Sequence, residues 1–316
     1  MKVSVVIPVY RAEPVLARCV KSLLAQTHSD LELIFVDDCS PDASVELIRR
    51  LAGDDARVKV VSLDANRGRV GARLEGVARA AGEYVGFVDA DDWVEPDCYA
   101  KLLAAAVRED ADAVVCGYCD VAADGTASSP HRVSSCCVDP QEFVAQSFYS
   151  PGFNSLCNKI FRRELALEWL SDELPNLCVG EDLAMTMRFL SRARRLAFVD
   201  EPLYSYRKTE ISISREISRR TVSDMVTCVR WLATEFPALP PMRLDIMRCH
   251  VLWSVLRCTG LSADECRSLA GELEADFLSC PSVPLVKRIV LPFAVRHVVA
   301  GRFIIRGIEF VRKVLS

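Results

Sequence analysis

The chain has 316 residues, and its 51% hydrophobic and 26% charged residues are the composition of an ordinary globular protein. The formal net charge of −4 argues against nucleic acid as a partner. The length suggests two domains, and the 14 irregularly spaced cysteines do not indicate a disulfide framework in a chain of this size.

Strand-like and helix-like segments alternate along the first part of the chain. Short apolar runs predict strands at residues 3–7, 31–36, 58–63, 84–88 and 112–116. Apolar residues at helical spacing, together with capping residues, predict helices at 13–26, 41–51, 69–81 and 96–108. This βαβ spacing predicts an α/β fold whose mostly parallel sheet has helices on both faces.

Polar residues follow the predicted strands at the points where the strands end. They are Tyr10, Asp37 and Asp38, Asn66 and Arg67, and the cluster from Asp89 to Asp92. The carboxyl ends of parallel strands share one edge of a sheet, and ligands bind at that edge. We therefore expect the functional site there.

The carboxylates Asp89, Asp91 and Asp92 come directly after a run that is apolar enough to be buried on both faces. Like charges at the mouth of a buried strand repel one another and resist desolvation. A bound cation resolves this conflict, and oxygen ligands suit Mg²⁺ or Mn²⁺, which commonly hold a diphosphate. The alternative interpretation is a solvated acidic turn that caps the following helix.

Two common nucleotide-binding motifs are absent from the sequence. No G-x-G-x-x-G follows the first predicted strand, which argues against a dinucleotide fold of the dehydrogenase type. No G-x-x-x-x-G-K-[ST] occurs either, so the chain is not a P-loop enzyme.

From about residue 118 the alternation becomes less regular. Residues 154–170 predict an edge strand that leads into a helix. Glu181 and Asp182 then open an amphipathic helix, and short strands are predicted at 196–199 and 203–206. Acidic residues in a first helical turn favour the helix dipole, which alone could explain that acidic pair.

Beyond residue 217 the pattern is helical to the end, so we expect one domain at 1–215 and a helical C-terminal region at 216–316. The tail at 285–316 holds seven Lys or Arg residues and one acidic residue, Glu309. The last predicted helix has a basic face with Arg302, Arg306 and Lys313. Its opposite face is apolar and consists of Ile304, Ile308, Val311 and Leu315. This pattern predicts either peripheral contact with anionic lipid or packing on the rest of the chain with the basic side in water.

The start of the chain lacks the cleavage site of a signal peptide, and no charge-free apolar run approaches the length of a membrane span. We therefore expect a cytoplasmic protein, located at the inner face of the cell membrane if the tail binds lipid. No feature of the sequence indicates an oligomeric state.

Several of these segments together resemble the inverting GT-A-fold glycosyltransferases of family two. The resemblance covers about residues 1–215 and rests on motifs in a fixed order: VVIPVY at 5–10 with Glu13, QT at 26–27, VDD at 36–38 with Ser40 and Asp42, NRG at 66–68, AR at 72–73, GEY at 82–84, DADDW at 89–93 and GED at 180–182. Two further motifs, NK at 158–159 and LYSYR at 203–207, resemble a subgroup that acts on capsule and lipopolysaccharide-type glycans.

This resemblance implies a GT-A fold, a Rossmann-like and mostly parallel sheet, followed here by a helical C-terminal region. It implies metal-dependent, inverting transfer of a sugar from a nucleoside-diphosphate sugar, with UDP as the default nucleotide. The acceptor would be a hydroxyl of a glycan or of a lipid-linked acceptor in surface polysaccharide synthesis. Mn²⁺ or Mg²⁺ is the implied cofactor.

The same resemblance implies roles for individual residues. Asp91 would ligate the metal directly, Asp89 would face the metal and the ribose, and Asp182 would be the general base, with Glu181 as second candidate. Asp38 would bind the nucleotide base and Tyr10 would flank it. The full set of expected nucleotide-binding residues is Pro8, Tyr10, Glu13, Asp38, Arg67, Arg73, Asp89, Ala90 and Arg207, with the three arginines on phosphate.

Each of these assignments has a purely structural alternative. Asp38 could cap a helix, Tyr10 could pack in the core, and each arginine could form a surface salt bridge. Two positions also depart from the family pattern, since Arg11 and Leu74 stand where Asn is common. We expect these departures to alter donor preference rather than to abolish activity.

Two rival functions fit part of the pattern. A sugar nucleotidyltransferase also uses an α/β sheet and a metal-binding acid, but it carries a Gly-rich basic loop after the first strand, which residues 8–12 do not form. A catalytically degenerate scaffold would bind nucleotide without needing a base. The presence of Asp91 together with Asp182 argues against that second alternative.

Overall fold

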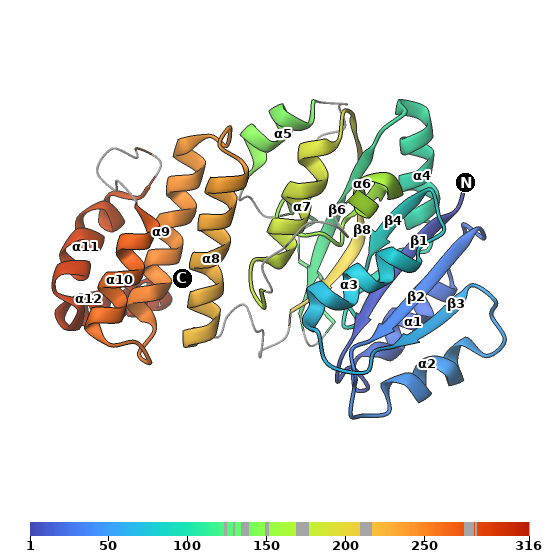
Figure 1. The fold of residues 1–316 in the computed structure, drawn as a ribbon, viewed down its shortest axis with the longest axis horizontal. Helices are drawn as coiled ribbons and strands as arrows, with labels where there is room; N and C mark the ends of the chain where they lie inside the picture. Colours follow the sequence, from blue (N-terminus) through green and yellow to red (C-terminus); the bar gives the residue numbers. More distant parts are fainter. Residues whose placement is uncertain are drawn as a thin grey trace. The chain divides into compact units, whose positions relative to one another are not determined.

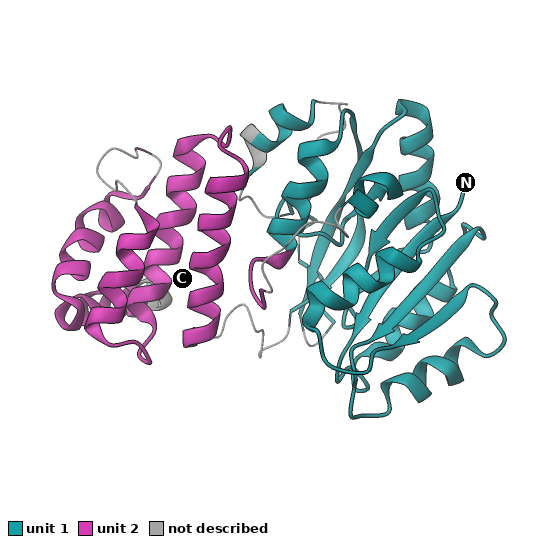
Figure 2. Cartoon of the chain, in the orientation of Figure 1, with its two compact units in different colours: residues 1–176, 182–210 teal, residues 177–181, 211–316 magenta. Residues whose placement is uncertain are grey.

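The computed structural model describes residues 1–122, 125–128, 130–133, 139–148, 152–168, 177–208, 217–274, 281 and 283–315. The chain divides into two compact units, shown in different colours in Figure 2. The first unit consists of residues 1–176 and 182–210, and the second of residues 177–181 and 211–316.

The first unit is built on one sheet. Within the described residues this sheet has eight strands in the order β3-β2-β1-β4-β7-β6-β8-β5 (Figure 1). The strands are β1 (Val3–Val9), β2 (Leu31–Asp37), β3 (Val58–Ser62), β4 (Tyr84–Phe87), β5 (Trp93–Val94), β6 (Ala113–Val121), β7 (Lys159–Arg162) and β8 (Leu196–Arg207). β1 pairs in parallel with both β2 and β4, and β6 pairs in parallel with β8. The predicted α/β architecture with a mostly parallel sheet is confirmed.

Helices connect these strands. They are α1 (Leu16–Leu24), α2 (Ser44–Ala52), α3 (Gly68–Arg79), α4 (Cys98–Glu109), α5 (Pro140–Ser147), α6 (Arg163–Leu167) and α7 (Glu181–Arg192). The chain runs from β1 to β2 to β3 in one direction and then crosses to β4 on the other side of β1. Because such crossovers are right-handed, α3 covers the face opposite α1 and α2. The order reverses between β1 and β4, which is where open α/β sheets bind ligands.

The approach of α3 to the sheet depends on one glycine. A Cβ atom at Gly76 would lie 2.3 Å from Cγ1 of Val6, on β1. Only glycine therefore lets α3 pack this closely. Arg73 lies one turn earlier on the same helix and is thereby held against the sheet.

Three local predictions need correction. α2 begins at Ser44 and not at Pro41, because Asp42 accepts hydrogen bonds from the backbone and hydroxyl of Ser44 and holds the preceding residues in a turn. β7 is not an edge strand, because it pairs antiparallel with β4 on one side and β6 on the other. The two short strands expected after residue 195 form the single strand β8, whose register shifts beside Gly117 absorb the residues between them.

The second unit is helical, as predicted for the C-terminal region. Its helices are α8 (Arg219–Glu235), α9 (Pro241–Arg257), α10 (Ala263–Leu273), α11 (Leu285–Arg296) and α12 (Val298–Leu315). Ser218 and Ser262 each form a capping box, which satisfies the first backbone N–H groups of α8 and α10. Among the described residues, no helix has the length and apolar character needed to cross a bilayer.

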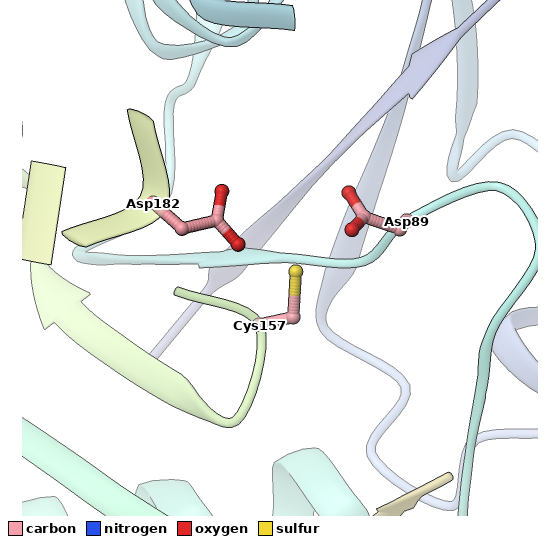
Figure 3. A group of neighbouring side chains, drawn as sticks. All are labelled: Asp89, Cys157 and Asp182. Atoms are coloured by element: carbon pink, nitrogen blue, oxygen red, sulfur yellow. The ribbon is translucent and has the colours of Figure 1, made fainter. Parts of the chain in front are cut away.

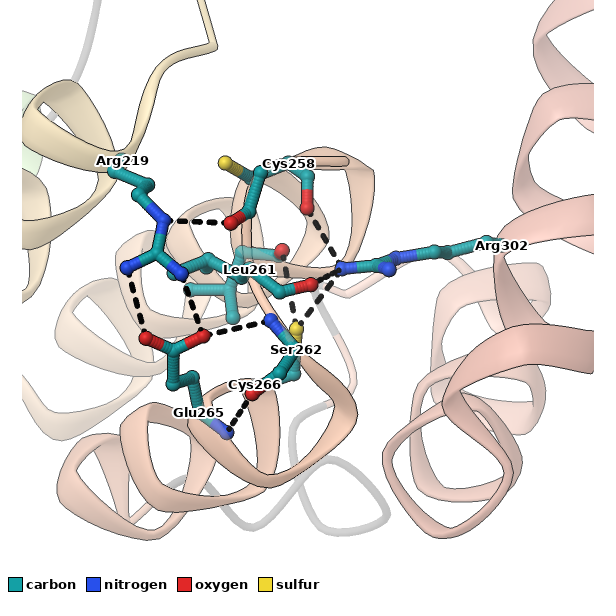
Figure 4. Close-up of polar contacts among 9 residues, drawn as sticks. Arg219, Cys258, Leu261, Ser262, Glu265, Cys266 and Arg302 are labelled. Atoms are coloured by element: carbon teal, nitrogen blue, oxygen red, sulfur yellow. Dashed lines mark hydrogen bonds and ion pairs between the residues drawn. The ribbon is translucent and has the colours of Figure 1, made fainter.

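The predicted basic face of the last helix is wrong at Arg302, whereas Arg306 is exposed as predicted. The guanidinium of Arg302 is not on a solvated basic face but donates hydrogen bonds to the backbone carbonyls of Leu256, Cys258 and Leu261 (Figure 4). Ile304, which the alternative of packing on the rest of the chain would bury, is 41% exposed, whereas Ile305 is fully buried. Carbonyls near the end of α9 need donors, and Arg302 supplies them, which fixes the rotation of α12.

Candidate active site

Acidic side chains gather at the carboxyl ends of the strands on either side of the switch point. Asp38 follows β2 and is buried, and its carboxylate accepts a 2.6 Å hydrogen bond from the backbone N–H of Arg67. Burial raises the pKa of Asp38, although this hydrogen bond opposes the shift. Asp38 therefore joins the end of β2 to the loop that leads into α3.

Arg73 lies at the centre of the site. Its side chain is fully buried, and its two terminal nitrogens bind different carboxylates. Nη2 donates to Asp89 at 2.8 Å, and Nη1 donates to Asp182, which is 109 residues away in sequence, at 2.5 Å. This fork joins the end of β4 to the first turn of α7. The phosphate contact expected of Arg73 differs from this arrangement, in which the guanidinium neutralises two carboxylates.

Asp89 and Asp182 lie on either side of a buried cysteine. Figure 3 shows their carboxyl groups directed toward each other, with the sulfur of Cys157 between them. One oxygen from each carboxylate and the sulfur lie within 4.8 Å of one another. Burial raises the pKa of the Cys157 thiol well above its usual value. Without a bound cation the thiol is therefore protonated.

The charges of the acidic loop are compensated unevenly. Burial alone would raise the pKa of Asp89, but Arg73 and Arg69 outweigh it and hold that pKa below the usual range. Asp91 shows the opposite result, because burial and the neighbouring charge of Asp89 raise its pKa despite Arg207 and Arg69. Asp91 thus stands next to Asp89 with its negative charge less well neutralised. A pair of oxygen donors in this state suits a hard divalent cation.

Asp92 has a structural role in the loop. It is buried, accepts a short hydrogen bond from the hydroxyl of Tyr204, and accepts a 2.7 Å bond from the backbone N–H of Arg207. Burial and the charges of Asp89 and Asp91 raise the pKa of Asp92 well above its usual value. Asp92 therefore fastens the acidic loop to β8, the strand that carries Arg207.

Asn158 and Lys159 organise the loop that presents Cys157. The Lys159 ammonium is buried and donates to the backbone carbonyls of Gly152 at 2.7 Å and Ser155 at 2.5 Å and to the side-chain oxygen of Asn158 at 2.8 Å. Asn158 in turn donates to the carbonyl of Cys116 on β6 at 2.7 Å. Burial lowers the pKa of Lys159 to about 7. These contacts close residues 152–158 into a compact loop beside Asp89.

The expected nucleotide-binding residues differ in accessibility. Tyr10, just past β1, exposes 44% of its surface and is the accessible aromatic ring at this sheet edge expected to flank a base. Pro8 is buried within β1. Glu13 is exposed and accepts a 3.2 Å hydrogen bond from the backbone of Ala43. The remaining three are an exposed Arg67, which pairs with Glu75, and a half-buried Ala90 and Arg207.

The two acids at the start of α7 fall on either side of the division between the units. Asp182 groups with the sheet and Glu181, which is buried, groups with the helices. The preceding segment, residues 177–181, is held by α8. Asp224 accepts a 2.8 Å hydrogen bond from the backbone N–H of Cys178, and the thiol of Cys228 donates to the carbonyl of Gly180. The residue next to Asp182 in the chain is thereby fixed in place.

Three residues of the site were missed by sequence reasoning. Arg69 precedes Arg73 by one helical turn, so their spacing could have placed both on one face of α3. Tyr206 lies near enough to the carboxylates that burial and their charges raise the pKa of its hydroxyl to about 12. Cys157 carried no signal, because a lone cysteine is most often an inert core residue.

Comparison with known proteins identifies the family. The profile named Glycosyl transferase family 2 matches residues 4–170, which is more than half of the chain. The chain belongs to this family. The matched region ends before Asp182, so the family assignment rests on the sheet and the acidic loop. Membership of this family favours a glycosyltransferase over a sugar nucleotidyltransferase.

Relatives in the family include enzymes of polysaccharide synthesis. The chain is 33% identical over 218 residues to the uncharacterised glycosyltransferase EpsJ of Bacillus subtilis strain 168, a match that covers 67% of this chain and 62% of EpsJ. The match therefore spans less than two thirds of EpsJ. The chain is also 30% identical to TuaG of the same organism, a putative teichuronic acid biosynthesis glycosyltransferase, over 67% of this chain and 81% of TuaG.

The fold has a solved counterpart. Residues 1–349 of TarS from S. aureus, crystallised in complex with UDP-GlcNAc, superpose with a TM-score of 0.71 over 99% of this chain and 92% of that one. The sequence identity is 21%. This likeness confirms the GT-A-type fold with a helical C-terminal region.

Proposed function

We propose that this protein transfers a sugar from a nucleoside-diphosphate sugar to a hydroxyl of a glycan or lipid-linked acceptor, with divalent metal and with inversion at the sugar carbon. The observation that carries the proposal is the pair Asp89 and Asp182, brought together by Arg73 at the ligand-binding edge of the sheet. One carboxylate belongs to the predicted diphosphate site and the other to the predicted base. Transfer chemistry needs both groups next to the same sugar.

A uridine nucleotide is the proposed leaving group. Support comes from the solved TarS complex with UDP-GlcNAc, whose fold this chain shares. Tyr10 would flank the base and Asp38, next to it at the strand ends, would accept a hydrogen bond from it. Pro8, Glu13 and Ala90 would line the nucleotide through neighbouring backbone, while Arg67 and Arg207 would bind phosphate.

Asp89 and Asp91 would hold the divalent cation, Mn²⁺ or Mg²⁺. Their carboxylate oxygens suit a hard ion, whereas the soft sulfur of Cys157 does not, so Cys157 is left out of the ligand set. When bound, the cation would act as a Lewis acid and neutralise the charge of the leaving diphosphate.

Asp182 would remove the proton from the acceptor hydroxyl, with Glu181 as second candidate. As that proton leaves, the hydroxyl oxygen forms a bond to the sugar carbon and the bond from this carbon to the diphosphate oxygen breaks, so the configuration inverts. We assign to Arg73 the positioning of Asp182 and Asp89 rather than a contact with phosphate, since both terminal nitrogens already bind the carboxylates.

The acceptor is proposed to belong to surface polysaccharide synthesis, and the reaction to take place in the cytoplasm at the inner face of the membrane. TuaG and the succinoglycan biosynthesis protein ExoO, to which the chain is 31% identical over 232 residues, support this assignment. Lipid-linked acceptors reside at that face, so a peripheral contact through residues 285–316 would bring enzyme and acceptor together.

A thermal-shift titration tests the donor and the metal. UDP, GDP, CMP and dTDP would each be added with and without Mn²⁺, and UDP with Mn²⁺ should raise the melting temperature. Asp91→Asn should abolish the part of the shift that depends on metal. Absence of any nucleotide-dependent shift would contradict the proposal and favour a degenerate scaffold.

Asp182→Asn tests the base. This variant should bind UDP with Mn²⁺ nearly as the native chain does, but should transfer sugar at least about a hundredfold more slowly. Asp110→Asn, on an 81% exposed side chain of the same unit, is the matched control and should leave transfer unchanged. Near-native transfer by Asp182→Asn would assign the base to another group.

A further inference from the structure

Large apolar side chains are concentrated on the outside of α11 and α12. Of the fourteen large hydrophobic residues that are exposed in the described part of the chain, nine lie between residues 285 and 311. They are Leu285, Val286, Ile289 and Phe293 on α11, and Val299, Phe303, Ile304, Phe310 and Val311 on α12. Phe303 and Phe310 are 70% and 69% exposed. We call these nine residues the apolar face.

The residues of the apolar face are not the residues that pack α11 and α12 into the unit. Leu291 and Ala294 of α11 and Ile305 of α12 are fully buried on the opposite sides of their helices. A Cβ atom at Gly301 would lie 2.4 Å from Cβ of Ala294, so the two helices approach each other as closely as glycine permits. The internal contacts of the unit are therefore satisfied by other residues, and the apolar face remains in water.

Arg302 fixes which side of α12 faces outward. Its guanidinium binds the carbonyls of Leu256, Cys258 and Leu261, which lie at the end of α9 and in the following loop (Figure 4). The same loop is held by Arg219, which pairs with Glu265 at 2.8 Å and donates to the carbonyl of Gly260. Rotating α12 to bury Phe303 would break these bonds of Arg302, so the outward position of the apolar face is built into the fold.

The charges around the apolar face have one sign. The single acid of residues 285–316, Glu309, is half-buried, pairs with Arg257 at 3.0 Å and accepts a 3.0 Å hydrogen bond from Trp253. Arg296 and Arg306 are exposed beside the apolar residues. The face therefore offers apolar side chains and cations, with no exposed acid in its described residues.

We propose that the apolar face of α11 and α12 inserts into the surface of an anionic lipid bilayer. An interface with apolar depth and negative headgroups satisfies both kinds of side chain at once. A second copy of the chain fits less well, since a two-fold interface would bring the exposed Arg296 and Arg306 onto an identical face that offers them no exposed acid among its described residues. The apolar residues, rather than a solvated basic stripe, form the primary contact.

Vesicle flotation of the full chain tests this proposal without donor or metal, so its result is independent of the transferase assignment. The native chain should float with vesicles of phosphatidylcholine and phosphatidylglycerol in equal parts, and at least about tenfold less with phosphatidylcholine alone. Phe303→Ser with Phe310→Ser should weaken binding to the anionic vesicles at least about tenfold, because two inserted rings are lost.

Met242→Ser is the matched control, since Met242 is a 47% exposed apolar residue on α9 of the same unit. It should bind as the native chain does. Circular dichroism checks that the double variant is folded. Native-level vesicle binding by the folded double variant would overturn the proposal. A native dimer in light scattering that the double variant converts to monomer, without any vesicle binding, would also overturn it and assign the face to a second copy.

Discussion

Replacing Arg73 with methionine should lower the free energy of unfolding of the first unit by about 3 to 5 kcal/mol. Methionine keeps most of the buried aliphatic volume, so the change isolates the loss of the guanidinium. Arg73 makes two charge-assisted hydrogen bonds, to Asp89 and Asp182, whose side chains are only 19% and 27% exposed. Hydrogen bonds to charged groups contribute about 1.5–3 kcal/mol each, so the loss of two gives about 3–6 kcal/mol, which overlaps this range.

The assay is urea-induced unfolding followed by fluorescence and circular dichroism. Arg79→Met is the matched control, because Arg79 lies on the same helix but is 54% exposed and pairs with Glu75 in solvent. Such surface pairs contribute less than about 1 kcal/mol. Adding Asp182→Asn to Arg73→Met should cost less than the sum of the single changes, because the buried carboxylate is then no longer left without its cation.

The reasoning is refuted if Arg73→Met and Arg79→Met shift the urea midpoint by the same amount. Equal shifts would mean that solvent, and not Arg73, neutralises Asp89 and Asp182. Strictly additive effects of Arg73→Met and Asp182→Asn would also refute it, since they would show that the two groups do not interact energetically.

Two further predictions concern packing and pH. Gly76→Ala should destabilise the first unit by about 1–3 kcal/mol, because the added Cβ overpacks against Val6. Gly271→Ala is the control and should be neutral or stabilising, because a Cβ there meets no other atom. Equal effects of the two changes in urea unfolding would contradict the close approach of α3. Burial lowers the pKa of Lys159 from 10.5 to about 7. The unfolded chain therefore binds the proton more tightly, and the stability of the native chain relative to Lys159→Met should rise between pH 7 and 10 by about 3–4 kcal/mol. If the free energy of unfolding changed with pH in the same way for both chains, Lys159 would not be desolvated.

The alternation of strands and helices in the first 121 residues could be predicted because each element there is coded locally. The apolar run that becomes β2 and the helical spacing that becomes α3 each match the structure to within a few residues. The helix before β2 was predicted too long, since α1 covers Leu16–Leu24 only. Local patterns carry element type well and element ends poorly.

The position of β7 could not be predicted in the same way. Its partners β4 and β6 are far away in the sequence, and pairing is decided by which strand edges remain open when the chain returns. The same limit applied to Arg73, because its bond to Asp182 spans 109 residues. Residue type and strand-end position predicted that the acids would lie close together, but not that Arg73 would bind two of them.

The buried side of α12 could not be predicted for a different reason. Apolar residues occur around most of this helix, so spacing alone permits either Ile304 or Ile305 to face the interior. The choice was made by Arg302, whose hydrogen bonds to three carbonyls outweigh the placement of any one apolar side chain. A polar anchor can decide which apolar residues stay in water.

The segment at residues 177–181 has a practical consequence for anyone shortening this chain. A truncation after residue 210 would keep every strand and every carboxylate of the site. It would nevertheless delete Asp224 and Cys228, which hold the backbone of Cys178 and Gly180. Gly180, with φ of 92°, would then lose the hydrogen bond to its carbonyl and be free to relax. Such a truncation would therefore keep the residues of the site but remove the contacts that hold the chain just before Asp182.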